Sequence, residues 1–253
     1  MNPNDYIAVF DSGVGGISVL RHLKRLLPSE RFLYFGDSAN APYGTKTKEQ
    51  VRALTFAAAE MLMTQGIKAL VVACNTATSA AINDLRKAYP ELIIIGIEPA
   101  LKLAADKFPG GSLGVMATPM TLREEKFAGL MERFRDSCEI YKIPAPGLVE
   151  LIEAGKADSP ETEELLKELF APYPRLDALV LGCTHYPFAA KAISQVLGHD
   201  TVLLDGGDGT ARETKRRLTE AGLLRTGEGS VTFQNSKNSP ELLALSEQLL
   251  DER

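Results

Sequence analysis

Two of the three cysteines, Cys74 and Cys183, lie in segments of similar sequence. Residues 69–76 (ALVVACNT) align with residues 178–185 (ALVLGCTH), and each cysteine follows an apolar run that predicts a buried strand. A thiol accepts a proton when it is ionised and donates one when it is protonated. Two thiols at equivalent positions could therefore take a proton from one face of a carbon atom and return a proton to the other face.

Each of these residues also has a simpler interpretation. A single cysteine at a strand end is most often a small buried apolar side chain, although a repeated pair would need that coincidence twice. Cys138 has no counterpart and precedes a strand, so we interpret it as structural. His185 lies two residues after Cys183 and could be either a hydrogen-bonded core residue or an acid–base group.

Short apolar runs that alternate with amphipathic stretches must position these residues. Runs of apolar residues predict strands at 7–10, 32–35, 69–73, 93–97, 113–116, 140–143, 178–181 and 202–204. Apolar residues at spacings of three and four predict helices within 51–62, 127–134 and 165–170. Such alternation indicates an α/β protein with mostly parallel sheets, flanked by helices and buried on both faces.

Polar side chains follow most of the predicted strands, at the ends where parallel sheets bind ligands. They are Asp11, Ser12, Asp37, Ser38, Cys74, Asn75, Thr76, Glu98, Thr118, Cys183, Thr184, His185 and Asp205. Helix N-termini and hydroxyl or amide groups at these junctions could hold a substrate carboxylate. Asp37 and residues 205–209 (DGGDG) could instead cap turns or helices. Asp11 and Glu153 could assist proton transfer, and Glu153 could equally be an exposed helical acid.

The repeat predicts a duplicated α/β unit with two similar lobes. We expect one lobe to carry Cys74 and the other to carry Cys183, with a pseudo-twofold relation that brings both thiols to a cleft between the lobes. The expected boundaries are residues 1–97 with 207–253 for the first lobe and residues 98–206 for the second.

Composition excludes several classes of protein. The 253 residues include 28 basic and 33 acidic ones, a balance that argues against nucleic-acid or acidic-membrane partners. No apolar run reaches the ~18 residues of a membrane span, and the start (MNPNDY) does not read as a signal peptide, so we expect a cytoplasmic protein. Three cysteines and three histidines match no disulfide framework or zinc motif, and we expect no metal.

Four motifs resemble glutamate racemases, in order along residues 6 to 222. They are residues 11–20 (DSGVGGISVL), 35–44 (FGDSANAPYG), 73–77 (ACNTA) and 181–187 (LGCTHYP). The resemblance implies a cofactor-independent enzyme that interconverts L- and D-glutamate for peptidoglycan synthesis, commonly as a homodimer. The glycines within residues 13–16 fit neither common nucleotide-binding motif, and we interpret them as residues that let backbone amides approach a small anion.

The resemblance also assigns roles to residues. Cys74 would take the α-proton of D-glutamate and Cys183 that of L-glutamate, with Asp11 assisting the first thiol, and Glu153 and His185 the second. Substrate contacts are expected from strand-end and loop residues: Asp11, Ser12, Asp37, Ser38, Pro42, Tyr43, Gly44, Asn75, Thr76, Thr118, Thr121, Thr184 and His185.

Two positions depart from the family's pattern. Ala117 stands where glycine is usual before Thr118, and Glu150 stands where proline is common, so the assignment of Glu153 depends on register. Three alternatives remain open. They are a racemase or epimerase of the same superfamily that acts on aspartate or another substrate, a two-lobed amino-acid binding protein without catalysis, and a thiol hydrolase that uses Cys183 and His185.

Overall fold

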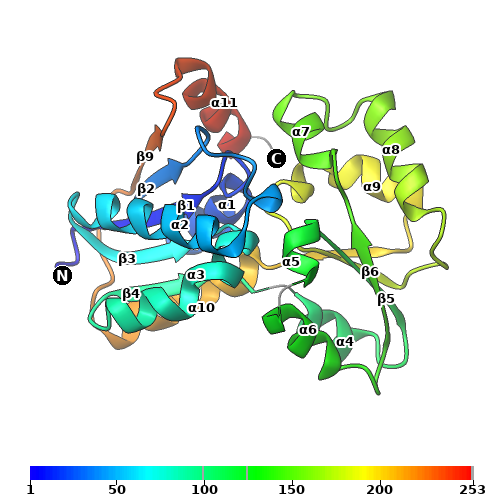
Figure 1. Ribbon diagram of the computed structural model, residues 1–253. Helices are drawn as coiled ribbons and strands as arrows, with labels where there is room; N and C mark the ends of the chain where they lie inside the picture. The colour runs from blue at the N-terminus through cyan, green and yellow to red at the C-terminus, as the bar shows by residue number, and fades with distance from the viewer. Residues whose placement is uncertain (99, 124, 252–253) are drawn as a thin grey trace. The chain divides into compact units, whose positions relative to one another are not determined.

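The computed structural model describes residues 1–98, 100–123 and 125–251. The chain divides into two compact units, Met1–Glu98 with Gly207–Arg253 (unit 1) and Pro99–Gly206 (unit 2). Each unit is an α/β layer structure with one parallel sheet (Figure 1).

Unit 1 contains a five-stranded sheet of order β4-β3-β1-β2-β9, in which every neighbouring pair is parallel. The strands are β1 (Tyr6–Asp11), β2 (Arg31–Gly36), β3 (Ile67–Val72), β4 (Ile93–Gly96) and β9 (Ser230–Asn235). The helices are α1 (Ile17–Leu26), η1 (Tyr43–Thr45), α2 (Lys48–Met63), α3 (Asn75–Ala88), α10 (Gly207–Glu220) and α11 (Pro240–Asp251).

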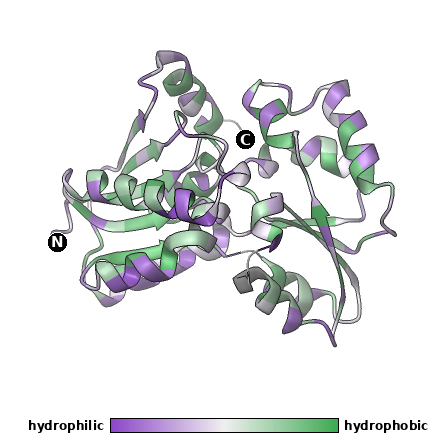
Figure 2. Ribbon diagram, viewed as in Figure 1, coloured by the Kyte–Doolittle hydropathy of each residue, from purple (hydrophilic) through white to green (hydrophobic). Residues whose placement is uncertain are grey.

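The strand order determines which helices cover each face of this sheet. The chain moves from β1 to β2 in one direction and then to β3 on the other side of β1. Because parallel crossovers are right-handed, this reversal puts α1 and α2 on opposite faces. Consistent with this, α1 packs against α10 and α11, whereas α2 packs against α3. The apolar colour along β1 and β3 in Figure 2 reflects strands that are buried on both faces.

Unit 2 contains a four-stranded parallel sheet of order β6-β5-β7-β8. Its strands are β5 (Ser112–Ala117), β6 (Glu139–Pro144), β7 (Ala178–Leu181) and β8 (Val202–Asp205). Its helices are α4 (Leu101–Lys107), α5 (Pro119–Arg123), α6 (Glu125–Glu132), α7 (Leu148–Glu153), α8 (Pro160–Phe170), η2 (Tyr186–Ala189) and α9 (Ala190–Leu197).

Successive residues of β7 contribute to separate cores on the two faces of this sheet. Leu179 and Leu181 pack in one cluster with residues of α7, α8 and α9, and Ala178 and Val180 pack in the other with residues of α4 and α5. This alternation is the two-residue period of a strand whose two faces are both covered by helices. In Figure 1 these two groups of helices lie on opposite sides of the sheet.

The two sheets share one strand order, because β4-β3-β1-β2 of unit 1 corresponds to β8-β7-β5-β6 of unit 2. The cysteine-bearing strands β3 and β7 occupy equivalent places, and β9 is an addition at one edge of unit 1. The predicted α/β class with two similar lobes is therefore confirmed.

The predicted strands all exist, with small differences at their ends. Ala73 and Ile97 lie outside β3 and β4, and the helix predicted to reach residue 134 ends at Glu132. Strand β9 and helix α11 were not predicted. The interpretation of residues 205–209 as a turn is wrong for most of them, because Asp205 ends β8 and α10 already begins at Gly207, which leaves only Gly206 between the two elements.

Candidate active site

In unit 1, three loops meet at the carboxyl ends of the central strands. The backbone N–H of Asp37 donates to the carbonyl of Asp11 (2.9 Å), and the N–H of Ala73 donates to the carbonyl of Phe10 (2.8 Å). The ends of β1, β2 and β3 are therefore level. The strand order reverses beside β1, and such a switch point is where open α/β sheets bind ligands.

Cys74 caps helix α3, which starts one residue later. Its Sγ accepts a hydrogen bond from the N–H of Ala77 (3.4 Å), and its thiol donates to Oγ of Ser12 (3.6 Å). The side chain is buried, with 5% of its surface exposed. A helix N-terminus and a donated N–H both favour negative charge on the sulfur, which is what a thiol base requires.

Asp11 ends β1 and is completely buried. Its Oδ2 accepts a hydrogen bond from the N–H of Gly13 (3.0 Å). The loop after β1 passes close to this carboxylate, since a Cβ at Gly16 would lie 2.6 Å from Cβ of Asp11. At least one amide of the glycine-rich segment therefore binds the protein's own carboxylate.

Asp37 follows β2 and is held by two donors from its own loop. The Tyr43 hydroxyl donates to Oδ2 (2.7 Å), and Nδ2 of Asn40 lies 3.0 Å from Oδ1. Burial, followed by this hydrogen bond and by the charges of Asp37, Cys74 and Asp11, raises the pKa of Tyr43 well above its usual range. Tyr43 therefore stays a neutral donor, and Asp37 supports the loop that also carries Ser38, Pro42 and Gly44.

Asn75 and Thr76 form the first turn of α3 and are buried. Among the described residues, the Nδ2 group of Asn75 has no hydrogen-bond partner. A buried donor without a partner carries a desolvation cost that a ligand acceptor can offset. This amide, next to Cys74, is therefore a candidate ligand-binding group.

In unit 2, Cys183 follows the equivalent strand β7 and is partly exposed. Its Sγ lies 3.8 Å from Nδ1 of His185, and Nε2 of that histidine lies 2.9 Å from Oε1 of Glu153 at the end of α7. His185 is buried, whereas the Glu153 side chain is 34% exposed. The result is a thiol–imidazole–carboxylate row in which the imidazole can carry a proton between its neighbours.

Glu153, and not Glu150, is the acid that contacts His185. Glu150 is exposed, and its charge contributes to the raised pKa of Tyr186. Burial is the largest cause of that increase, followed by the charges of Cys183 and Glu150.

The remaining predicted residues of unit 2 lie near the ends of β5 and β7. Oγ1 of Thr118 is 3.0 Å from Oγ1 of Thr121 and accepts the N–H of Thr121 at 3.3 Å. Thr184 is buried. Ala117 packs closely on Gly182, where a Cβ would lie 2.9 Å from the Ala117 methyl. The methyl group of Ala117 thus leaves no room for a side chain at residue 182, which is glycine.

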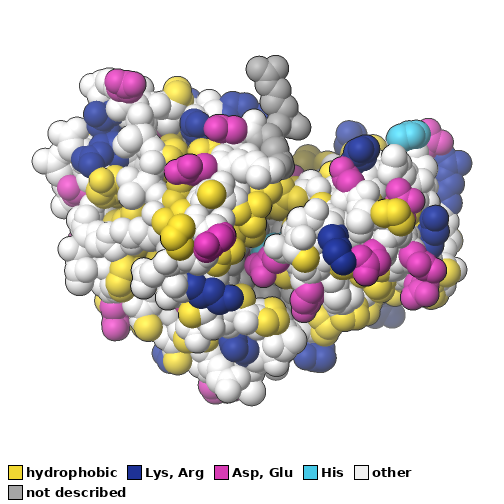
Figure 3. Space-filling model, turned by 90° about the horizontal axis from the view of Figure 1, so that it is seen from above, with side chains coloured by type: hydrophobic (Ala, Val, Ile, Leu, Met, Phe, Trp, Pro, Cys, Tyr) yellow, Lys and Arg dark blue, Asp and Glu magenta, His cyan; other side chains and the backbone are white. Residues whose placement is uncertain are grey.

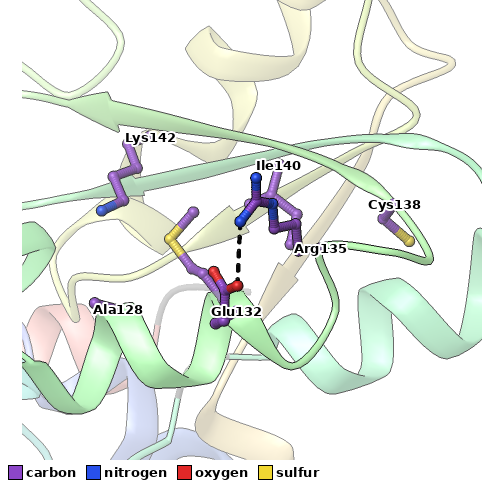
Figure 4. Close-up of a pocket in the computed structure, with 7 residues that line it drawn as sticks. Ala128, Glu132, Arg135, Cys138, Ile140 and Lys142 are labelled. Carbon is purple, nitrogen blue, oxygen red and sulfur yellow. Dashed lines mark hydrogen bonds and ion pairs between the residues drawn. The ribbon is translucent and has the colours of Figure 1, made fainter.

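Cys138 lies at the opposite end of its sheet, because it precedes β6 whereas Cys183 follows β7. It is buried, and its thiol donates to the carbonyl of Phe108 (3.4 Å). Together with six other residues it lines a surface pocket of about 320 Å³ beside α6 and β6 (Figure 4). This pocket contains none of the predicted site residues: it is lined by Ala128, Met131, Glu132, Arg135, Cys138, Ile140 and Lys142.

Sequence reasoning missed several supporting residues. Asn40 and Tyr34 hold loops at the site, the first through Asp37 and the second through a hydrogen bond from its hydroxyl to the carbonyl of Gly13 (2.7 Å). The available signal was a hydroxyl within an otherwise apolar strand, since a buried tyrosine usually needs a partner for its O–H group.

Three further observations bear on possible ligands. None of the three cysteines, all within the described ranges, forms a disulfide. Over those same ranges, no cluster of three or more His, Cys, Asp or Glu side chains could hold a metal ion, and no helix is long and apolar enough to cross a membrane. On the face shown in Figure 3, acidic and basic side chains are interspersed rather than gathered in patches of one sign.

Comparisons with known proteins agree with the motifs. Residues 7–214 match the Asp/Glu/Hydantoin racemase family. A glutamate racemase of Clostridium botulinum (strain Alaska E43 / Type E3) is 50% identical over 252 residues, which cover 98% of each chain. The crystal structure of the Thermus thermophilus glutamate racemase in complex with β-chloro-D-alanine is 39% identical with a TM-score of 0.83, over 100% of this chain and 95% of that one. The Francisella tularensis enzyme in complex with D-glutamate has a TM-score of 0.86 at 28% identity, over 99% and 95%.

Proposed function

This chain belongs to the Asp/Glu/Hydantoin racemase family and is an amino-acid racemase, and on that premise we propose that it interconverts L- and D-glutamate by two-thiol proton transfer without a cofactor. The observation that carries the mechanism is the equivalence of Cys74 and Cys183. Each thiol follows the equivalent strand of a repeated sheet, at the point where the strand order reverses.

In this proposal, one thiolate removes the α-proton and the other thiol donates a proton to the opposite face of the same carbon. Cys74 acts as base on D-glutamate and Cys183 on L-glutamate, and each acts as acid in the reverse direction. After turnover the two sulfurs have exchanged protonation states, and proton exchange with solvent restores either form. The atoms and charges balance without an external acid or base.

The surroundings of the two thiols support distinct ways of assisting them. Beside Cys74, the N–H of Ala77 donates a hydrogen bond that stabilises the thiolate, and Oγ of Ser12 accepts a hydrogen bond from the protonated thiol. Beside Cys183, the imidazole of His185 is held by Glu153 and can take or return the thiol proton. We propose that Asp11 assists Cys74 as His185 and Glu153 assist Cys183.

Binding of the substrate carboxylates would use groups at the strand ends. The Nδ2 of Asn75, which lacks a partner among the described residues, is the clearest donor. Thr76 is next to Asn75 in the sequence, and Thr184 is next to Cys183. The two threonines come shortly after the ends of the equivalent strands β3 and β7. Further contacts are proposed from Asp11, Ser12, Asp37, Ser38, Pro42, Tyr43, Gly44, Thr118, Thr121 and His185. Such fixed donors stabilise the developing charge at the α-carbon, where no cofactor ring accepts it.

The proposal is tested by racemisation of purified protein with no added cofactor. Circular dichroism should decay to zero from either enantiomer of glutamate. Cys74→Ser and Cys183→Ser should each lower kcat/KM at least ~100-fold, because a hydroxyl is a much weaker acid than a thiol. Cys138→Ser is the matched control, expected to stay within about twofold.

Other results would redirect the assignment. Decay with aspartate and none with glutamate would contradict the proposed substrate. Binding of glutamate without decay would favour a binding protein, and an unaffected Cys74→Ser variant would contradict the two-thiol mechanism.

Three further proposals rest mainly on the resemblance. We propose that the protein acts as a homodimer, in the cytoplasm, and that its D-glutamate supplies peptidoglycan. The three thiols without a disulfide are typical of a reducing compartment. Analytical ultracentrifugation tests the dimer, fractionation tests the compartment, and rescue of depleted cells by D-glutamate tests the cellular role.

A further inference from the structure

We propose that Tyr34 is a positioning residue that fixes the loop after β1 against Cys74, a role that rests on the proposed function of that thiol. Tyr34 lies in β2 and is 1% exposed. Its hydroxyl donates to the carbonyl of Gly13 (2.7 Å), which belongs to the buried loop between β1 and α1. The side chain therefore connects one strand with the loop of another.

The carbonyl and the N–H group of Gly13 bind two different side chains. Its carbonyl accepts the Tyr34 hydroxyl, and its N–H donates to Oδ2 of Asp11 (3.0 Å). Ser12 lies between Asp11 and Gly13 in the sequence, and its Oγ accepts a hydrogen bond from the Cys74 thiol (3.6 Å). Fixing the Gly13 peptide groups thus holds the Asp11 carboxylate and also the neighbouring Ser12, which contacts the first thiol.

The backbone of β2 also comes close to the same carbonyl, at Gly36. A Cβ at Gly36 would lie 2.5 Å from the Gly13 oxygen, which is closer than real Cβ atoms come to other atoms. The Gly13 carbonyl is therefore bonded to the Tyr34 hydroxyl and leaves no room for a side chain at residue 36. A substitution at Tyr34 or at Gly36 can therefore displace the Gly13 carbonyl while Asp11, Ser12 and Cys74 themselves are not substituted.

The ring of Tyr34 has a packing contact that does not depend on its hydroxyl group. It packs against Phe233 of β9 with ring centroids 5.9 Å apart. Tyr34→Phe should therefore keep the packing and remove only the hydroxyl, leaving the Gly13 carbonyl without this donor.

The test compares alkylation of the two active-site thiols with racemisation. Iodoacetamide labelling of Cys74 and Cys183 is followed by mass spectrometry from pH 6 to 9. Tyr34→Phe should label Cys74 about fivefold faster, because a loosened loop uncovers a thiol that is now 5% exposed. Cys183 should stay within twofold. Two titratable side chains, those of Asp11 and Tyr43, lie near Cys74, and both remain in the variant. Any change in the dependence of Cys74 labelling on pH therefore comes from a change in their position.

Racemisation should slow at the same time. We expect kcat/KM to fall about fivefold to tenfold, the range for loss of one buried hydrogen bond. Tyr6→Phe is the matched control, because it removes another tyrosine hydroxyl of the same sheet, bonded to Arg31 (2.5 Å) at the opposite strand end. It should leave both the labelling of Cys74 and kcat/KM within twofold.

The outcomes separate the possibilities. Equal acceleration of Cys74 and Cys183 would indicate general loosening and overturn the positioning role, as would unchanged labelling of Cys74. If Tyr34→Phe does not fold, Gly36→Ala displaces the same carbonyl and must give the same Cys74-selective change. Labelling requires no turnover, so a wild-type protein without racemase activity would refute the proposed function while leaving the role of Tyr34 in the loop testable.

Discussion

Replacing Asn75 by alanine should change stability and activity in opposite directions. Within the described ranges, its buried Nδ2 lacks a hydrogen-bond partner. An unsatisfied buried polar group costs ~1–3 kcal/mol. Alanine removes that cost and is also the better helix former in the first turn of α3, whereas the lost packing offsets part of the gain. We expect the free energy of unfolding to rise by about 1 kcal/mol in urea denaturation.

Activity should fall because the same amide is proposed to bind a substrate carboxylate. A hydrogen bond to a charged group contributes ~1.5–3 kcal/mol, which corresponds to a loss of roughly 10- to 150-fold in kcat/KM. The carboxylate is bound before and during proton transfer, so the loss should lie mainly in KM.

Asn235 provides the matched control for this variant. It is also buried, but its Nδ2 donates to the carbonyl of Ser239 (3.1 Å) and its Oδ1 accepts the Ser239 N–H (3.0 Å). Asn235→Ala should therefore lose about 2 kcal/mol of stability. The reasoning is refuted if Asn75→Ala loses as much stability as Asn235→Ala while its kcat/KM stays within twofold of wild type.

The other variants test three separate interactions. Glu153→Gln should lower kcat/KM only about fivefold because solvent screens a side chain that is 34% exposed, whereas His185→Asn should lose about 100-fold, both measured by circular dichroism with glutamate. The pKa of Tyr43 is raised in the folded protein above its unfolded value near 10. Its contribution to stability is therefore complete below about pH 10 and lost as the pH rises further, and Tyr43→Phe should flatten that alkaline decline in urea denaturation. Lys68→Met should lose about 3–5 kcal/mol because it leaves the buried Glu30 carboxylate without its cation, and Lys68→Met with Glu30→Leu should regain most of that loss.

The sequence predicted those parts of the fold that depend on apolar periodicity. Most of the strands from β1 to β8 are short apolar runs, and interior strands such as β1 and β3 are buried on both faces. The edge strand β6 (EIYKIP) is the exception, since most of its residues are exposed or half-buried. Strand β9 was missed because its residues (SVTFQN) are mostly polar or half-exposed at a sheet edge, where one side of the strand needs no apolar partner.

Candidate site residues can be named from the sequence, whereas most of their contacts cannot. Strand-end position and repetition led to the prediction of Cys74 and Cys183, because parallel sheets align their carboxyl ends. The contact of His185 with Glu153 spans 32 residues and depends on how α7 packs against η2, which no local pattern encodes. The same holds for the hydrogen bond from Tyr34 to the Gly13 carbonyl, which links one strand to the loop after its neighbour.

The most direct test of the two-thiol mechanism is the location of solvent deuterium at low conversion. L-Glutamate is incubated with the protein in D₂O, without cofactor, and both enantiomers are separated before ~10% has reacted. The two-thiol mechanism predicts deuterium at the α-carbon of the D-glutamate formed and protium in the remaining L-glutamate, because one thiol removes the proton and the other delivers a solvent-derived deuteron. Deuterium appearing in the remaining L-glutamate as fast as in the product would mean that a single base serves both faces, and would contradict the two-thiol mechanism.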